Sequence, residues 1–272
     1  MVTTKKNVIN VFITFSLLLF TSSLLIAQDF QGKAYYYSKT PMNLGDWGAR
    51  MSVEQKKQIA ARLKNRLEKT YILTFNKEES LYREDEKLDA ISGATDSWGK
   101  NFTAGAQYKN VRTDVFLQDQ EFYGKQFLVK DQLKTLAWKM GSESKNIGQY
   151  TCFKATVLKS ANEVEWWNFS WDKIRNDETS NKDEVDMIEI ESWYTPMIPV
   201  SHGPGEYWGL PGLILEVSVG NTTMLCSKIV MNPKGIIKIK TPNKGKTVTK
   251  MEYNRIIIEK MKEFRNNRVG RR

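Results

Sequence analysis

Apolar and polar residues alternate along much of the chain between residues 111 and 240, a pattern typical of half-buried β-strands. Residues 149–158 show it clearly, with Phe153, Ala155 and Val157 on one side, and residues 213–219 show it again. The same pattern predicts further strands, at 111–117, 121–131, 136–140, 222–231 and 236–240.

Short turns separate several of these segments. Gly124 interrupts one alternating run, Gly220-Asn221 follows residues 213–219, and Pro233-Lys234-Gly235 precedes residues 236–240. A parallel neighbour would require a crossover of about a dozen residues or more. The short connections therefore favour antiparallel pairing in a meander.

Two segments show helical periodicity instead. Residues 51–70 place Ile59, Leu63 and Leu67 at every fourth position, after a capping box formed by Ser52 and Gln55. Near the C-terminus a second capping box joins Thr249 to Glu252. It precedes an apolar stripe made of Tyr253, Ile257, Met261 and Phe264.

These elements predict an α+β, β-rich fold: a curved antiparallel sheet with an early helix and a C-terminal helix. Residues 159–186 contain tryptophans and then acidic residues, and they interrupt the strands as a long excursion. The remaining length suits a single domain over residues 28–272 that ends in a basic helix and tail.

The N-terminus has the layout of a secretory signal peptide. Lys5 and Lys6 precede an apolar run, and small and apolar residues end at Ala27, which predicts cleavage after residue 27. Leu25 is bulky for such a site, so an uncleaved membrane anchor is the alternative. We expect export to the periplasm or outer envelope, and a soluble mature chain without a transmembrane segment.

Removing residues 1–27 leaves 39 basic and 31 acidic residues, a net charge of +8. Much of the excess lies in the C-terminal tail and in lysine-rich turns. Such charge can bind phosphate or an anionic membrane surface, but a solvated helix end has the same composition. No nucleic-acid-binding motif accompanies it, so we expect no nucleic-acid partner.

Cys152 and Cys226 are the two cysteines of the chain. An even number in an exported protein favours a disulfide, which would close a loop of 75 residues. Each is followed two residues later by lysine, which places both on the more polar faces of their strands. Two unpaired thiols are the alternative.

The stretch GEYWGLPGLILEV, residues 205–217, forms a rigid corner before a strand. Pro211 presets the backbone at the second position of a turn, and Gly212 offers the positive φ that a type II turn needs at the third. Gly203, Pro204 and Gly209 constrain the preceding residues further. We expect this corner to set the angle at which residues 213–219 enter the sheet.

This corner resembles the signature of the GLPGLI family of exported bacterial proteins. The hexapeptide Gly209-Leu210-Pro211-Gly212-Leu213-Ile214 is intact, and the matching frame extends over roughly residues 108–235. The resemblance implies export in Bacteroidota-like bacteria, a β-rich single domain and no established activity. Family members typically carry a polar residue such as Asn where this chain has His202. By analogy, the strand pattern is similar to the open half-barrels of periplasmic lipoprotein carriers.

Chemical motifs are sparse. His202 is the only histidine, so a catalytic unit that needs histidine must use it, and a surface or turn histidine is the more ordinary interpretation. We expect no metal site, because one histidine excludes a multi-histidine zinc site and two strand cysteines with that histidine would still need a fourth ligand. We expect no cofactor, because phosphate-binding and dinucleotide fingerprints are missing. Two acidic runs could supply a carboxylate pair for hydrolysis or could be solvated loops: Glu84, Asp85, Glu86, Asp89 and Asp183, Glu184, Asp186, Glu189, Glu191.

Aromatic residues are the sharper candidates for ligand or partner contact. Trp167, Phe169 and Trp171 alternate onto one side, where they would form a stacking platform or cover the edge of the core. Trp193 and Trp208 join them as candidates.

We expect a non-catalytic protein that binds or carries a hydrophobic ligand or an envelope partner. The alternatives are an accessory of an outer-membrane transporter or secreted assembly, and an envelope hydrolase that uses paired carboxylates.

Overall fold

The computed structural model describes residues 30–42, 44, 48–85, 104–164, 166 and 186–269. The chain separates into two compact units, Met1–Phe30 and Gln31–Arg272, and the described elements belong to the second. The predicted signal peptide, the aromatic run at 167–171 and most of the predicted excursion lie outside the described residues. None of the described helices is long and apolar enough to cross a membrane.

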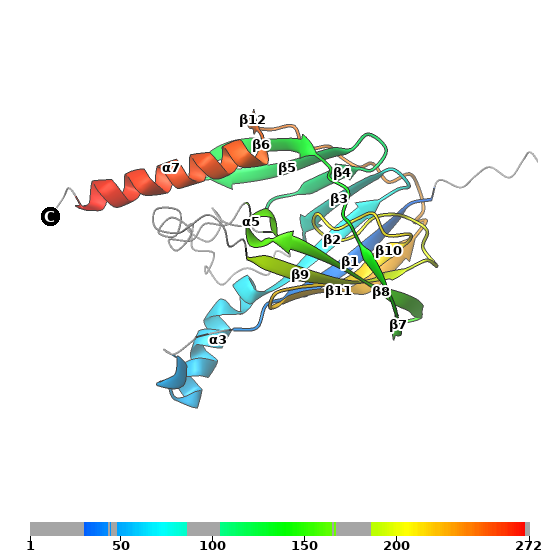
Figure 1. Ribbon diagram of the computed structural model, residues 1–272, viewed down its shortest axis with the longest axis horizontal. Coiled ribbons are helices and arrows are strands. Elements are labelled where there is room, and N and C mark those ends of the chain that lie inside the picture. The colour runs from blue at the N-terminus through cyan, green and yellow to red at the C-terminus, as the bar shows by residue number, and fades with distance from the viewer. Residues whose placement is uncertain are drawn as a thin grey trace, which may run out of the picture. The chain divides into compact units, whose positions relative to one another are not determined.

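The described part of the second unit forms one twelve-stranded sheet (Figure 1). Its order is β12-β6-β5-β4-β3-β2-β1-β11-β10-β9-β8-β7, and all neighbours are antiparallel except β12 and β6. The strands are β1 Gly32–Lys39, β2 Glu68–Phe75, β3 Glu79–Glu84, β4 Gln107–Asn110, β5 Val115–Phe122, β6 Lys125–Gln132, β7 Lys139–Ile147, β8 Tyr150–Ser160, β9 Met187–Thr195, β10 Leu213–Val219, β11 Thr222–Met231 and β12 Lys246–Val248.

The sheet consists of two meanders that meet at its middle. Strands β1 to β6 follow one another toward one end, and β7 to β11 run in order from the other end back to β1. The junction is the pairing of β1 with β11, which joins Gly32 to Met231 and Lys39 to Thr223. The predicted β-rich fold, with its antiparallel curved sheet and two helices, is confirmed.

Both capping boxes form as predicted. Helix α3 (Val53–Leu67) begins after Ser52, whose hydroxyl accepts from the Gln55 backbone while the Gln55 side chain accepts from the Ser52 backbone. Its end differs from the prediction, because residues 68–70 already belong to β2. Helix α7 (Lys250–Val269) begins after Thr249, which pairs reciprocally with Glu252. A single turn, α5 (Ala161–Val164), follows β8.

Helix α7 packs its apolar stripe onto the sheet around β6. Tyr253, Ile257 and Met261 are buried, and they join a core cluster with residues of β5, β6 and β12. Phe264 is partly exposed and contacts the ring of Tyr123. A second cluster fills the β8–β10 side and contains Ala155, Val157, Ile190, Tyr194, Leu210, Ile214 and Val217.

Side-chain amides that satisfy the backbone explain two departures from the predicted strands. Of the predicted strand 111–117, residues 115–117 belong to β5 and the first four residues do not. Residues 111–114 form a turn, since Asn110 Oδ1 accepts from the backbone N–H groups of Arg112 and Thr113 at 3.0 and 2.9 Å. Residues 236–240 are not a strand, since the Gln31 side chain accepts from Ile237 N at 2.8 Å and donates to Gly235 O at 2.7 Å. The segment at 136–140 contributes only its last two residues, to β7.

The corner leads into β10 as predicted, but its turn is different. Gly212 does not have a positive φ, so the predicted type II turn is wrong, and the positive φ of +90° belongs to Gly209. Gly212 is needed for close approach, because a Cβ there would lie 2.2 Å from the carbonyl oxygen of Thr195. The corner is held by Leu213 N donating to Ile198 O and Ile214 N donating to His202 O, at 2.9 and 3.0 Å.

The predicted disulfide is not formed, and both cysteines are buried free thiols. Cys152 lies on β8 and Cys226 on β11, with β9 and β10 between them in the sheet. Neighbouring strands are about 4.8 Å apart, whereas a disulfide needs Cα atoms within about 7 Å. Burial raises the pKa of Cys152 to about 11 and that of Cys226 to about 12, which keeps both as unreactive thiols.

Candidate ligand-binding site

A cavity of about 220 Å³ lies against one face of the sheet. Its wall includes residues from β4 and from β8, which are seven strand spacings apart in the sheet order. That separation would be about 34 Å in a flat sheet, so the sheet must curve around the cavity. The wall consists of Ser38, Tyr71, Tyr82, Ala104, Gly105, Gln107, Lys159, Glu163, Val164, Gly205, Glu206, Tyr207, Val219, Thr222 and Met224.

One side of the cavity is a neutral aromatic wall. The rings of Tyr71 and Tyr82 stack with centroids 4.8 Å apart, and the Tyr82 hydroxyl donates to Met224 Sδ at 3.7 Å. Burial raises the pKa of both tyrosines far above their ordinary value, so both hydroxyls stay protonated. This wall therefore offers apolar surface to a ligand.

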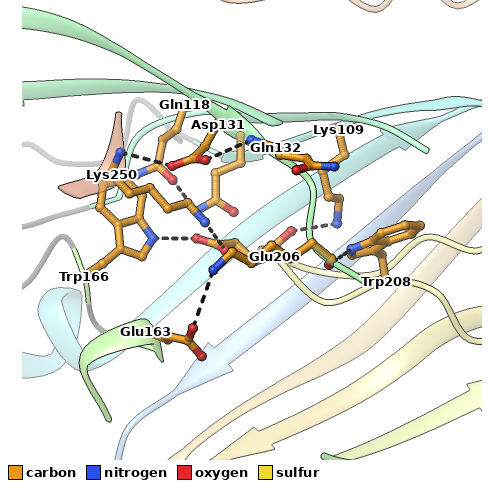
Figure 2. Close-up of polar contacts among 12 residues, drawn as sticks. Lys109, Gln118, Asp131, Gln132, Glu163, Trp166, Glu206, Trp208 and Lys250 are labelled. Carbon is orange, nitrogen blue, oxygen red and sulfur yellow. Dashed lines mark hydrogen bonds and ion pairs between the residues drawn. The ribbon is translucent and has the colours of Figure 1, made fainter. Parts of the chain in front are cut away.

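The corner contributes Gly205, Glu206 and Tyr207 to the cavity wall and is held by Lys109, a fully buried lysine on β4 (Figure 2). Its ammonium donates to the carbonyl oxygens of Gly203, Gly205 and Tyr207, at 2.8, 2.7 and 3.2 Å. Burial lowers the pKa of Lys109 to about 7, and the charge of Glu206 opposes that shift. The three carbonyls match the three N–H donors of an ammonium, so Lys109 fixes the corner to the sheet.

Glu206 ties the same corner to helix α7. Its Oε1 accepts from Trp166 Nε1 and its Oε2 from Lys250 Nζ, each at 2.5 Å (Figure 2). Lys250 Nζ also lies over the ring of Phe116, 4.3 Å from its centroid. Both carboxylate oxygens of Glu206 are thus already engaged by protein donors.

A chain of buried glutamines supports the cavity from β4 and β5. Gln107 donates to Gln118 and Gln118 donates to Gln120, both at 2.8 Å, and Gln120 Oε1 also accepts from Gly105 N at 3.3 Å. Because a backbone N–H can only donate, this last bond fixes the direction of the whole chain. The Oε1 of Gln107 is left buried and without a hydrogen-bond partner among the described residues.

His202 is not the surface residue that its turn-rich surroundings suggest. It is fully buried, and neither ring nitrogen makes a hydrogen bond of ordinary geometry with a described residue. Burial and the nearby charge of Lys109 lower the pKa of His202 to about 3, against a smaller opposing effect of the Asn76 backbone. The imidazole is therefore neutral, and it does not line the cavity.

The predicted aromatic contacts lie elsewhere. Trp208 is buried and donates through its indole to Lys134 O, and its own carbonyl accepts from Trp138 at 2.8 Å. Trp193 is buried beneath Lys145, whose Nζ is 4.2 Å from the ring centroid. Neither tryptophan belongs to the cavity wall, and Trp167, Phe169 and Trp171 lie outside the described residues.

None of the described members of the acidic runs lines the cavity. Glu84 pairs with Lys69 at 2.7 Å, and Glu191 pairs with Lys154 at 3.0 Å. The carboxylates that do line the cavity are Glu163 and Glu206, which come from α5 and the corner.

Sequence reasoning missed the residues that build this site. Lys109 and Gln107 sit in a four-residue strand that alternation does not single out, and Lys159 lies at the end of β8. The one available signal was Glu206, a charged residue inside an otherwise glycine-rich and aromatic corner.

Comparisons with known proteins add a family match and a structural likeness. Residues 138–216 match a family described as a protein of unknown function (Porph_ging). No match was found among curated proteins. Two structures of PNGF-II, in space groups C2 and P21, share 15% and 16% identity with TM-scores of 0.49 and 0.48. Each match covers 84% of this chain, which spans about a third of PNGF-II (32% and 33%).

Proposed function

We propose that this protein is an exported, non-catalytic binding protein that holds a small, largely apolar ligand in the cavity enclosed by its curved sheet. The observation that carries the proposal is the cavity itself, whose wall combines stacked tyrosines with aliphatic and thioether side chains. A concave apolar pocket with few polar groups is the usual form of a small-molecule site.

The polar groups of the cavity favour binding over hydrolysis. A carboxylate pair for hydrolysis needs one group free to give a proton and one free to activate water or attack. Both oxygens of Glu206 are occupied by Trp166 and Lys250, and Glu163 lies 3.8 Å from Lys134. This arrangement supports a structural role for Glu206, and it gives Glu163 no free carboxylate partner in the cavity wall.

Export is part of the proposal and rests on the sequence. Residues 1–27 have the layout of a signal peptide, and the corner carries the intact hexapeptide of the exported GLPGLI family. A carrier or receptor in the periplasm or outer envelope fits both features.

A larger side chain in the cavity wall should weaken the binding of an apolar probe. We expect Thr222→Phe, which projects a ring into the cavity wall, to weaken binding of the uncharged dye N-phenyl-1-naphthylamine at least about tenfold, or about 1.4 kcal/mol. The measurement is a fluorescence titration, since emission of this dye rises in apolar surroundings.

The matched control is Thr223→Phe, the next residue on β11, which is half-buried like Thr222 and does not line the cavity. Each threonine gives up one hydroxyl–hydroxyl contact, to Thr40 and to Ser218 respectively. Equal binding by both variants, or no binding by the wild-type protein, would contradict the proposed site.

A further inference from the structure

Lys159 brings a positive charge to the wall of the cavity. It lies at the end of β8, is half-buried, and hydrogen-bonds to no described residue. Burial lowers the pKa of Lys159 from the ordinary lysine value. The surrounding protein groups therefore do not fully replace the water that the charged ammonium loses. A half-buried ammonium in an apolar setting favours an anion beside it.

The carboxylates near Lys159 are already paired with other lysines. Glu206 accepts from Lys250 at 2.5 Å, and Glu163 lies 3.8 Å from Lys134. The two carboxylates raise the pKa of Lys159, and the two lysines lower it. Within the described part of the chain, Lys159 is therefore the cavity cation without a counterion of its own.

From this geometry we infer that the ligand is an amphipathic anion, with an apolar chain against the Tyr71–Tyr82 wall and one negatively charged group paired with Lys159. This inference rests on the proposed function and specifies its ligand class. A carboxylate or a phosphate monoester on a short hydrocarbon chain has this chemistry. One ammonium matches one anionic group, and a charge-assisted hydrogen bond is stronger than a neutral one.

Three ligands with eight carbon atoms each separate the contributions of the charge and the apolar part. Octanoate and octyl phosphate carry an anionic group, and 1-octanol carries none. We expect isothermal titration calorimetry to show that the wild-type protein binds the better anion at least about tenfold more tightly than 1-octanol. Preference between octanoate and octyl phosphate identifies the headgroup.

Lys159→Met tests the residue, since it keeps an apolar stem and removes the charge. We expect this variant to bind 1-octanol as the wild-type protein does and to lose the preference for the anion. Lys159→Arg should restore most of that preference. The control is Lys154→Met, which removes the same charge from the same strand on the opposite face and should leave the preference unchanged.

The outcomes distinguish this inference from the proposed function. Equal affinity of the wild-type protein for the anions and for 1-octanol, or an unchanged preference in Lys159→Met, would overturn the anionic ligand and leave an apolar binding site. Failure of all three ligands to bind the wild-type protein would overturn both.

Discussion

At the scale of single residues, the molecule depends on polar side chains buried where the sequence gives little sign of them. Lys109 and His202 are both completely buried, and they lie beside the same corner. Their environments differ in one respect: Lys109 has three acceptors, and His202 has no described partner of ordinary geometry. Substituting each therefore tests a different physical effect.

Loss of Lys109 should destabilise the fold strongly. Lys109→Met leaves three corner carbonyls without a donor, and we expect the free energy of unfolding to fall by about 3 kcal/mol or more. Chemical denaturation measures the change. Lys130→Met, at an exposed position on β6, is the control and should change stability by less than about 0.5 kcal/mol. A similar loss in both variants would refute the role assigned to Lys109.

The single histidine should make stability depend on pH. Because the folded protein holds the pKa of His202 at about 3, the unfolded chain binds a proton more readily below about pH 6.5. Stability is therefore lost as the pH falls from about 6.5 toward 3, and lowering the pH from 7 to 5 should cost about 2 kcal/mol through this group.

His202→Asn isolates that effect. Chemical denaturation at pH 7 and at pH 5 gives the loss in the free energy of unfolding between the two pH values. We expect this loss to be about 2 kcal/mol smaller in the variant than in the wild-type protein. The comparison uses the difference between the two pH values, so any packing defect that the variant has at both pH values cancels. An identical pH dependence in the two proteins would mean that His202 is not buried in its neutral form.

At the scale of elements, capping predicted the starts of α3 and α7, and alternation predicted β5, β6, β8, β10 and β11. Neither pattern predicted β1 to β4, β9 or β12. Ser52 and Thr249 begin α3 and α7 as expected, because a capping box depends only on residues three apart. The turn at 111–114 and the loss of a strand at 236–240 depend on Asn110 and Gln31. Gln31 lies about 200 residues from its partners, so no local pattern reveals its role.

The close approach of Gly212 to β9 leads to a prediction about the packing of these elements. Gly212→Ala should destabilise the protein by about 3 kcal/mol or more, because its Cβ would overlap the backbone of β9 at Thr195. Gly124 is the contrasting site, with a φ of +74° and open space around its Cβ position. Gly124→Asn should cost less than about 1 kcal/mol, since Asn tolerates this backbone conformation. Thermal unfolding that ranks the two variants in the reverse order would contradict the close-approach argument.

At the scale of the whole sheet, the antiparallel meander could be predicted and its strand order could not. Short turns such as Gly220-Asn221 fix neighbours within each meander, whereas the pairing of β1 with β11 has no local signal. The cavity depends on that pairing, since its wall takes Ser38 from β1 and Met224 from β11. The predicted disulfide was wrong for the same reason. The strand order places β9 and β10 between the two cysteines, and the sequence does not reveal that order.

The central position of β1 also constrains how the polypeptide is made. β1 lies near the beginning of the chain, and one of its two edges stays unpaired until β11 has been synthesised. A nascent chain therefore exposes an open strand edge during most of its translation, and pairings this distant in sequence form slowly. Until β11 pairs with it, this edge can accept a strand from another chain, so an unfinished polypeptide carries an aggregation hazard that the completed sheet removes.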